Sequence, residues 1–339
     1  MAQASIGLAV FGAGRIGAVH AKNVSSCAPQ AHLVGVADID PAAAQRLLNA
    51  AGSGRTGDID SFLDDPSVAG VIIATPTSTH AALIAQAAQA GKHVLCEKPI
   101  SLELAATAAA SREAEQAGII LQVGFQRRFD DEFSRVRALV EKGDLGAVRF
   151  LRLVGRDHRP PSHEYLRTSG GQYKDQMVHE FDAARWLMGP LEVDEVYATG
   201  SAIVDPSLDD FGDVDTTVAV LRFKGGALAV IDGSREAVYG YDVRGEIQGS
   251  KGLALIGHER LRNGSLMDAA HATADVESFI ERFAVAYKNE VVDFVAAIRK
   301  RRAPRVGARD ALEALRMAIA ADRSRAQRRP VKLAEVVDD

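Results

Sequence analysis

The feature that most constrains the fold is a glycine-rich turn between an apolar run and a helical pattern. Ile6 to Phe11 is an apolar run typical of a buried strand, and Gly12-Ala13-Gly14-Arg15-Ile16-Gly17 follows it directly. Glycines at this spacing permit a tight turn and let backbone N–H groups at a helix start face a pyrophosphate. Asp38 follows at about the spacing of 20 residues expected for an acid on the adenosine ribose. The pattern predicts a dinucleotide site that includes Gly12, Gly14, Arg15, Ile16, Gly17 and Asp38.

Short apolar runs alternate with helical patterns over the first third of the chain, which is typical of a parallel sheet built from βαβ units. Further strands are predicted at Leu33 to Ala37, Val71 to Ala74, His93 to Cys96 and Ile119 to Gly124. Helices are predicted at Ala18 to Ser25, Pro41 to Ala51, Thr79 to Ala90 and Leu102 to Gly118. We therefore expect an α/β Rossmann domain, a doubly wound parallel sheet, over residues 1–123.

Asp38 also bears on the choice of cofactor. A carboxylate accepts hydrogen bonds from ribose hydroxyls but repels a 2′-phosphate, and the next residue is Ile39 rather than an arginine. This favours NAD, while Arg15 and Arg46 nearby in the sequence leave NADP possible. Two alternatives stay open: the glycine turn holds no ligand, or Asp38 only caps its loop.

Two loops are expected at the carboxyl edge of this sheet, where open α/β folds bind ligands. One is the hydroxyl-rich stretch from Thr75 to His80, and the other is Glu97-Lys98-Pro99. Lys98 is a cation that could polarise a substrate hydroxyl or carbonyl, although a lysine in such a place is ordinarily a solvated surface charge. The candidates for cofactor contact in these loops are Thr75, Pro76, His80, Glu97 and Lys98.

A carboxylate and an imidazole lie four residues apart in the segment from Ser169 to Asp182. If this segment begins a helix, Asp175 and His179 share one face, with Asp175 near the positive end of the helix and His179 one turn in. The helical spacing of apolar residues continues to Gly189-Pro190, which ends it. The alternative is that Asp175 caps the helix and His179 is an interior histidine.

Residues 124–339 predict an α+β domain. Strands are expected at Val148 to Gly155, Val193 to Ile203, Thr216 to Phe223, Ala227 to Ser234 and Arg244 to Gly249, several of them joined by short glycine turns. Phe279 to Lys300 reads as one amphipathic helix. Its basic end, Arg299 to Arg302, complements the helix dipole, with a nucleic-acid patch as the alternative. The last helices could pack back on the first domain.

Composition argues against several classes of function. The 339-residue chain carries a net charge of -5, so it has no general attraction for nucleic acid or anionic membranes. Cys27 and Cys96 form neither a disulfide framework nor a zinc signature. We expect a cytoplasmic protein without a membrane segment, because the sequence has no export pattern and no apolar run of about 18 residues.

Taken in order, five motifs resemble the glucose-fructose oxidoreductase and inositol dehydrogenase family: Gly12 to Gly17, Asp38, Glu97-Lys98-Pro99, Gly124 to Asp130 and the Asp175/His179 segment. Within that family, Gly155 to Pro161, Gly212 to Thr216 and Tyr239 to Asp242 are most similar to bacterial inositol 2-dehydrogenases. The resemblance implies a Rossmann domain followed by an α+β domain with a large, mostly antiparallel open sheet. It also implies a homotetramer, or at least a dimer, that packs through this sheet.

The resemblance further implies NAD-dependent oxidation of a secondary ring hydroxyl of a cyclic polyol, with myo-inositol and its 2-keto product as the first expectation. His179 would take the hydroxyl proton, Lys98 would stabilise the negative charge on the reacting oxygen, and Asp175 would orient His179 or accept from substrate hydroxyls. Further substrate contacts are expected from Arg127, Asp157, His158 and Tyr239 or Tyr241. No metal is required, because the cofactor supplies the hydride chemistry.

Some residues near the expected pocket depart from the inositol dehydrogenase pattern: His158, Gln172, Tyr173, Gln176 and Glu180. Another inositol isomer or a pyranose sugar is therefore the main alternative substrate. A tightly NADP-bound sugar oxidoreductase is disfavoured by Asp38, and a non-catalytic NAD-binding sensor by the presence of Lys98 and His179. A metal-dependent lyase that uses Asp175, His179 and His158 as ligands is a further alternative.

Overall fold

The computed structural model describes residues 4–257 and 278–337. The chain as described divides into two compact units. Unit 1 comprises Met1–Phe129 and Val285–Leu312, and unit 2 comprises Asp130–Ala284 and Glu313–Asp339. The functional assignment of residues 1–123 to NAD and of residues 124–339 to substrate and oligomerisation stays a prediction.

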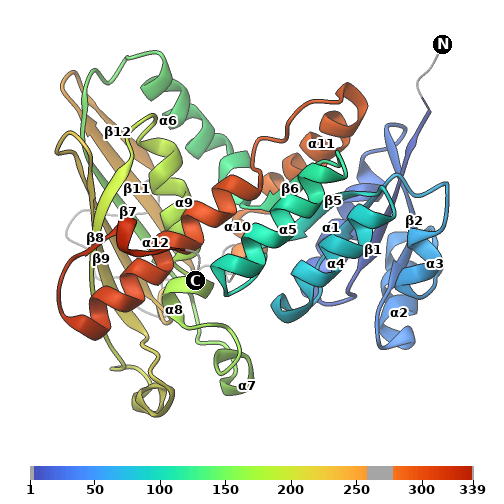
Figure 1. The fold of residues 1–339 in the computed structure, drawn as a ribbon, viewed down its shortest axis with the longest axis horizontal. Helices are drawn as coiled ribbons and strands as arrows, with labels where there is room; N and C mark the ends of the chain where they lie inside the picture. Colours follow the sequence, from blue (N-terminus) through green and yellow to red (C-terminus); the bar gives the residue numbers. More distant parts are fainter. Residues whose placement is uncertain (1–3, 258–277, 338–339) are drawn as a thin grey trace. The chain divides into compact units, whose positions relative to one another are not determined.

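Unit 1 is built, within the described residues, on a six-stranded sheet in the order β3-β2-β1-β4-β5-β6 (Figure 1). Its strands are β1 (Ile6–Phe11), β2 (Ala31–Ala37), β3 (Arg55–Thr56), β4 (Gly70–Ile73), β5 (His93–Glu97) and β6 (Leu121–Gly124). Each neighbouring pair is parallel. The chain order reverses between β1 and β4, and ligands of open α/β sheets bind at such a switch point. The predicted Rossmann class is confirmed.

The helices of unit 1 cover this sheet and close its core. They are α1 (Arg15–Ser26), α2 (Pro41–Ala51), α3 (Ile59–Leu63), α4 (Thr77–Gln89), α5 (Leu104–Gln116), the 3-10 turn η1 (Gln126–Phe129) and α11 (Ala284–Lys300). Helix α2 shows why its predicted bounds were right: the Asp40 side chain caps its start, and Gly52 ends it with a positive φ of 79°. Val291, Phe294 and Ile298 of α11 join the core of strand residues, so a segment remote in sequence completes unit 1.

Unit 2 carries, over the described part of the chain, a seven-stranded sheet in the order β12-β11-β7-β10-β9-β8-β13 (Figure 1). Its strands are β7 (Val148–Arg156), β8 (Val193–Ser201), β9 (Thr216–Phe223), β10 (Leu228–Ser234), β11 (Asp242–Gly249), β12 (Leu253–Ile256) and β13 (Val331–Lys332). Strands β7 and β10 pair in parallel, and the other described pairs are antiparallel. The predicted mostly antiparallel sheet is confirmed, while β12 and β13 were not predicted.

Helices of unit 2 include α6 (Asp131–Glu141), α7 (His163–Leu166), α8 (Gln172–Asp175), α9 (Val178–Leu187), the 3-10 turn η2 (Pro206–Phe211) and α10 (Phe279–Arg282); α12 (Ala308–Gln327) begins in unit 1 and ends in unit 2. The prediction of one helix from Phe279 to Lys300 is wrong, because the chain leaves helical geometry at Phe283. The Phe283 ring is fully buried and packs edge-on against Tyr241, and this tertiary contact accompanies the break.

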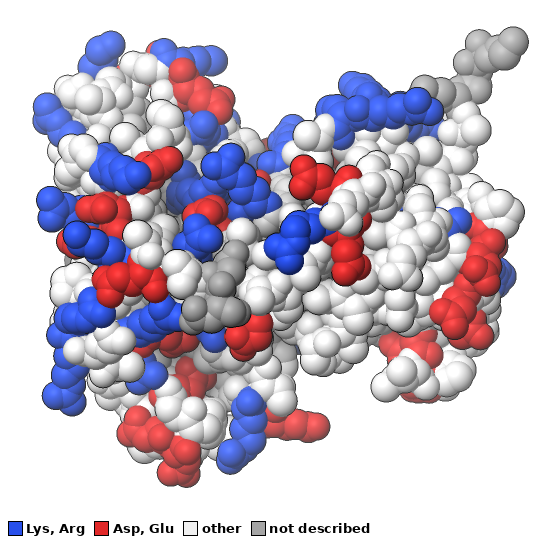
Figure 2. Space-filling view, viewed as in Figure 1, with Lys and Arg blue, Asp and Glu red and all other residues white. Residues whose placement is uncertain are grey.

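Charged side chains of both signs are interspersed over the face shown in Figure 2. The basic residues at the end of α11 have specific partners: Arg299 donates to the backbone oxygens of Ala4 and Gln30, and Arg302 pairs with Asp293 at 2.5 Å. These contacts account for two of the four basic residues within the fold of unit 1. None of the described helices is long and apolar enough to cross a membrane.

Candidate functional site

The glycine turn lies at the switch point of the unit 1 sheet, between β1 and α1. Gly12 has a φ of 99°, and a Cβ there would come within 2.5 Å of the backbone oxygen of Ala74. A Cβ on Gly17 would collide with the backbone of Gly12, whereas one on Gly14 would meet no described atom within 4 Å. Two glycines are therefore required by the turn itself, and the third leaves open space before the amino end of α1. This arrangement fits a pyrophosphate.

The carboxylate of Asp38 lies beside this turn, at the end of β2. One of its oxygens accepts from the Ala13 N–H at 2.6 Å, and the other accepts from the Asp40 N–H at 2.8 Å. Asp38 thus holds the turn and also places a carboxylate where a ribose would lie. Arg46 extends to Asp40 at 3.3 Å, and the Ile39 side chain is fully exposed. The surroundings of Asp38 fit NAD.

His80 connects the two loops predicted at the carboxyl edge of the sheet. Its ring is buried, with Nδ1 at 2.8 Å from the Pro99 oxygen and Nε2 at 2.8 Å from the Thr75 oxygen. The Thr75 hydroxyl lies 2.7 Å from that of Thr79, at the start of α4. His80 therefore holds the backbones of both loops. We infer that it influences a bound cofactor through the position of these loops. Pro76 and Lys98 follow the ends of β4 and β5; Pro76 is exposed and Lys98 half-buried.

Glu97 pairs with a histidine inside unit 1. Its carboxylate lies 2.7 Å from Nε2 of His20, on α1, and only 12% of the side chain is exposed. Glu97, a predicted cofactor contact, therefore lies in the interior of unit 1 beside α1, the helix that follows the glycine turn.

The prediction that Asp175 and His179 lie on one helix is wrong. Helix α8 ends at Asp175 and α9 begins at Val178, so Asp175 sits at the carboxyl end of one short helix and His179 near the start of the next. The side chain of Gln176 donates to the backbone oxygen of Ser234 at 2.8 Å, and Met177 is completely buried. These two contacts hold the chain against the sheet at the break. The alternative, in which Asp175 caps this helix, is excluded because Met177 stands at the start of α9.

Asp175 instead belongs to a buried charge network in unit 2. Tyr165 donates to one carboxylate oxygen at 2.7 Å, and Arg235 contacts the other at 3.3 Å. Arg235 has no exposed side-chain surface and also pairs with Asp213 at 3.2 Å. Burial of the hydroxyl, and then the charge of Asp175, raises the pKa of Tyr165 well above its ordinary value, so the phenol remains a donor.

Arg235, Tyr165 and Asp213 were not predicted as site residues. The available signal was weak: Arg235 follows β10 directly, and an arginine at the end of an apolar strand is commonly a surface charge. Arg235 is buried because the end of β10 packs against α8, and the sequence alone does not show this tertiary contact. His179 itself is half-buried.

The structure distributes the other substrate candidates between the units. Arg127 lies in η1 of unit 1 and is 3% exposed. In unit 2, the Asp157 N–H donates to the Ser234 oxygen, which also accepts from Gln176, so Asp157 lies beside the break between α8 and α9. Nδ1 of His158 lies 3.1 Å from the Ala237 oxygen. Lys98 and Arg127 thus belong to unit 1, whereas Asp157, His158, Asp175 and His179 belong to unit 2.

The tyrosine candidates have structural contacts of their own. The Tyr239 hydroxyl accepts from Arg156 and donates to Asp242, each at 2.8 Å. The ring of Tyr241 packs against Phe283. Both residues therefore help to hold the start of β11, and a substrate contact by Tyr239 stays a prediction.

Several polar residues were expected to border the substrate pocket because they depart from the inositol dehydrogenase pattern. Gln172, Tyr173 and Glu180 among them are buried and make contacts within unit 2. Gln172 donates to the side chain of Gln176 at 2.8 Å, and the Tyr173 hydroxyl donates to the Thr199 oxygen at 3.0 Å. The carboxylate of Glu180 packs so closely on β7 that a Cβ at Gly155 would collide with it. Because these side chains face the sheet, they are weak grounds for doubting an inositol substrate.

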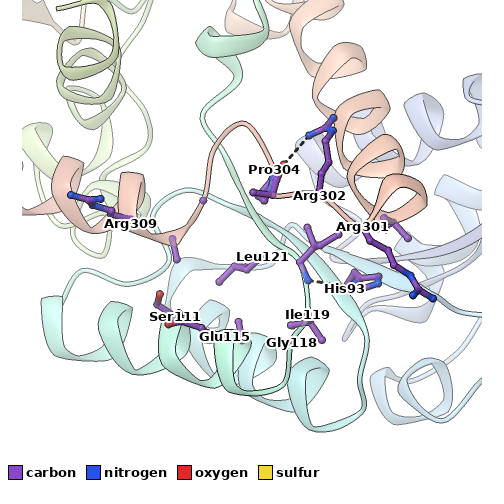
Figure 3. A pocket seen from close by; sticks show the side chains of 16 residues that line it. His93, Ser111, Glu115, Gly118, Ile119, Leu121, Arg301, Arg302, Pro304 and Arg309 are labelled. Carbon is purple, nitrogen blue, oxygen red and sulfur yellow. Dashed lines mark hydrogen bonds between the residues drawn. The ribbon is translucent and has the colours of Figure 1, made fainter. Parts of the chain in front are cut away.

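Unit 1 contains a cavity of about 710 Å³, shown in Figure 3, and no residue of the glycine turn lines it. His93 and Leu121 line it and begin β5 and β6, so it lies at the amino edge of the sheet. The segment between α11 and α12 closes another side, with Arg302 and Pro304 among its lining residues. The carboxyl edge, where the glycine turn lies, is the opposite one, so this cavity is not the dinucleotide site.

Comparison with known proteins agrees with this geometry. Residues 6–125 match the oxidoreductase family with an NAD-binding Rossmann fold, and residues 133–255 match the GFO/IDH/MocA C-terminal domain. The chain is 40% identical to the myo-inositol 2-dehydrogenase of Thermotoga maritima, over 97% of this chain and 99% of that one. It is 35% identical to the NAD-dependent scyllo-inositol 2-dehydrogenase of Bacillus subtilis, over 96% and 95%.

A solved structure gives the same result. The scyllo-inositol dehydrogenase of Lactobacillus casei, with bound NAD(H) and scyllo-inositol, superposes with a TM-score of 0.86 at 28% identity, over 97% of this chain and 99% of that one. Together with the glycine turn and Asp38, these matches define an NAD-dependent oxidoreductase. The chain belongs to the GFO/IDH/MocA family, which confirms the resemblance seen in its motifs. NAD is its cofactor.

Proposed function

We propose that this protein oxidises a secondary ring hydroxyl of an inositol with NAD, and that myo-inositol, oxidised to its 2-keto product, is the preferred isomer. The observation that carries the proposal is the presence, in one chain, of an NAD turn, a lysine at a strand end and the Asp175/His179 pair. Relatives named for myo-inositol and for scyllo-inositol cover nearly the whole chain, which supports a cyclic polyol. Another isomer or a pyranose sugar is the alternative substrate.

Bound NAD supplies the acceptor for the hydride. His179 accepts the hydroxyl proton, a role that suits an imidazole because its ordinary pKa of about 6.5 lies near working pH. The Lys98 ammonium stabilises the negative charge that develops on the same oxygen. Asp175, fixed by Tyr165 and Arg235, accepts hydrogen bonds from other hydroxyls of the ring and thereby orients it.

The test of substrate is a panel of polyols with NAD and with NADP, followed by the absorbance of the reduced nicotinamide. Myo-, scyllo- and chiro-inositol are compared with glucose and xylose. We expect the largest kcat/KM for myo-inositol with NAD. A larger value for a pyranose would replace inositol as the substrate, and loss of activity with a chelator would favour the metal-dependent alternative.

The test of the catalytic residues uses Lys98→Ala and His179→Ala. Each should lower kcat by about 10²- to 10⁴-fold while NAD still binds, because each removes a group that acts on the reacting oxygen. Lys22→Ala, on the exposed side of α1, and His163→Ala, on α7, are matched controls that should keep normal turnover. A normal rate for either test variant would refute its assigned role.

We also propose that the protein is a cytoplasmic homotetramer that assembles through the unit 2 sheet. Several apolar side chains on its strands are at least 39% exposed, including Tyr197, Val218 and Leu255. Tyr197 on β8 and Val218 on β9 lie on adjoining strands, and exposed apolar side chains so placed commonly mark a protein interface. Light scattering would give the mass directly, and a monomer at micromolar concentration would refute the assembly.

A further inference from the structure

Three titratable side chains from distant parts of the sequence meet in the interior of unit 1. They are His20 on α1, Glu97 at the end of β5 and Glu290 on α11, and one nitrogen or oxygen atom from each lies within 4.8 Å of the other two. His20 and Glu290 have no exposed surface. The cluster therefore joins the dinucleotide helix and α11 to the strand that leads into Lys98.

The cluster contains two carboxylates and only one group that can become a cation. His20 lies 2.7 Å from Glu97, so the imidazole serves that carboxylate. Neither carboxylate oxygen of Glu290 has a hydrogen-bond partner among the described residues. A buried carboxylate without a partner is strongly disfavoured in its charged form.

The surroundings of Glu290 show that its neighbours do not supply the missing charge. Asp293, one turn along α11, is paired with Arg302 at 2.5 Å and lies 3.4 Å from Arg305, so those cations are engaged. Gln122 on β6 donates to the backbone oxygen of Glu290 rather than to its side chain. Burial, then the charges of Glu97 and Asp293, raise the pKa of Glu290 well above its ordinary value.

The groups that face Glu290 also indicate where a proton on it would go. They are His20 from α1 and Glu97 from β5, and the charge of Asp293 on its own helix also acts on it. The Tyr287 ring packs edge-on against His20, with centroids 5.9 Å apart, and fixes the imidazole that serves Glu97. A protonated Glu290 becomes a donor, and the Glu97 carboxylate is an acceptor in the same cluster, within 4.8 Å.

We propose that Glu290 is a positioning residue that keeps a proton between itself and Glu97 and thereby fixes the end of β5 from which Lys98 extends. The proposal rests on the proposed function, in which Lys98 acts on the substrate oxygen. Glu290 touches neither substrate nor cofactor in this scheme. It acts through Glu97, whose backbone is continuous with that of Lys98.

The test compares Glu290→Gln, which is neutral and keeps an N–H donor, with Glu290→Ala, which removes the donor. We expect Glu290→Gln to retain kcat close to that of the unchanged protein, and Glu290→Ala to lower it by about 10²-fold with a smaller change in the NAD dissociation constant. Lys288→Gln, at an exposed position on the same helix, is the matched control and should keep kcat. Equal damage by the glutamine and the alanine variants would show that the charge is needed and would overturn the proposal.

Two measurements need no substrate and so separate this proposal from the assignment of inositol. Hydrogen exchange in the peptide covering residues 93–100 should be faster in Glu290→Ala and unchanged in Glu290→Gln. The urea midpoint of the unchanged protein should fall towards alkaline pH relative to Glu290→Gln, because a proton held only by the folded chain is lost as pH rises. Unaltered exchange in Glu290→Ala, a flat midpoint difference, or one equivalent of tightly bound divalent metal in the purified protein would each refute it. If the unchanged protein oxidises no inositol, the proposed function fails while these two results still decide the role of Glu290.

Discussion

Unit 1 and unit 2 each bury carboxylates next to a residue proposed to act on the substrate, but they balance the negative charge by different means. In unit 2, Asp175 and Asp213 share the guanidinium of Arg235 at 3.3 and 3.2 Å, and the Tyr165 hydroxyl adds a neutral donor. In unit 1, Glu97 and Glu290 have a single imidazole between them. A guanidinium cannot lose its charge at any working pH, whereas an imidazole and a carboxylic acid exchange protons with solvent.

Between these two networks, pH sensitivity should therefore reside in unit 1 rather than in unit 2. The network around Arg235 is balanced by a guanidinium, so the balance needs no bound proton. The cluster around Glu290 depends on a bound proton, so the end of β5 is the part of the protein whose order should respond to alkaline pH. Asp175 is also proposed to contact the substrate, whereas Glu290 is buried in the interior of unit 1.

The largest loss of stability is expected from Arg235→Met, which removes the cation of the unit 2 network. The methionine fills much of the same volume but leaves Asp175 and Asp213 buried without their cation, and breaking a buried pair in this way costs about 3–5 kcal/mol of unfolding free energy. Urea unfolding would measure this loss. The loss should shrink at acid pH, where protonation of the two carboxylates would make unit 2 resemble the proton-held cluster of unit 1.

The matched control for that experiment is Lys224→Met, directly after β9. Lys224 lies 2.6 Å from Glu192 and 65% of its side chain is exposed, so its pair should contribute about 0–1 kcal/mol. If the two variants lost the same stability, the guanidinium of Arg235 would not be what balances unit 2, and the contrast with unit 1 would disappear.

The elements of the fold and the site residues that could be predicted from the sequence are those that depend on local sequence patterns. β1, α2 and β9 have their predicted bounds, because each is a continuous pattern ended by glycine, proline or a turn. The glycine turn and Asp38 were predicted from spacing within one βαβ unit. Lys98 was singled out because it follows a strand directly.

The charge networks could not be predicted because their members are far apart in the sequence. Arg235 and Asp175 are 60 residues apart, and His20 and Glu97 are 77 apart. The pattern also gave no warning that the helix breaks after Asp175, since apolar spacing continues through Met177 while tertiary contacts of Gln176 reset the chain direction. Asp175 and His179 were therefore singled out because they were expected to share one face of a helix, and the structure does not support that reason.

A smaller effect is expected from a third carboxylate, which lies between the two extremes. Asp322 on α12 is half-buried, and its pKa is raised to about 6, mainly by burial and in part by Asp213, while Lys174 and Arg325 oppose the shift. The cations near Asp322 thus balance part of its negative charge, whereas Glu290 has no such cation among the residues that the structure describes. Asp322 also differs from Asp175, which shares the guanidinium of Arg235 with Asp213. Its behaviour should be intermediate.

Asp322→Asn tests this intermediate case through the pH dependence of unfolding. Because the folded-state pKa lies above the ordinary value of 3.8, the folded chain binds the proton more tightly, and this contribution is complete at low pH and lost as pH rises through about 6. The unfolding free energy of the unchanged protein relative to Asp322→Asn should therefore fall, by at most about 3 kcal/mol, between about pH 4 and pH 7. The exposed Asp210→Asn is the control, and its difference should stay nearly constant. A relative stability that rose with pH for Asp322 would mean that Lys174 and Arg325 outweigh burial, which would group Asp322 with the cation-balanced carboxylates of the Arg235 network.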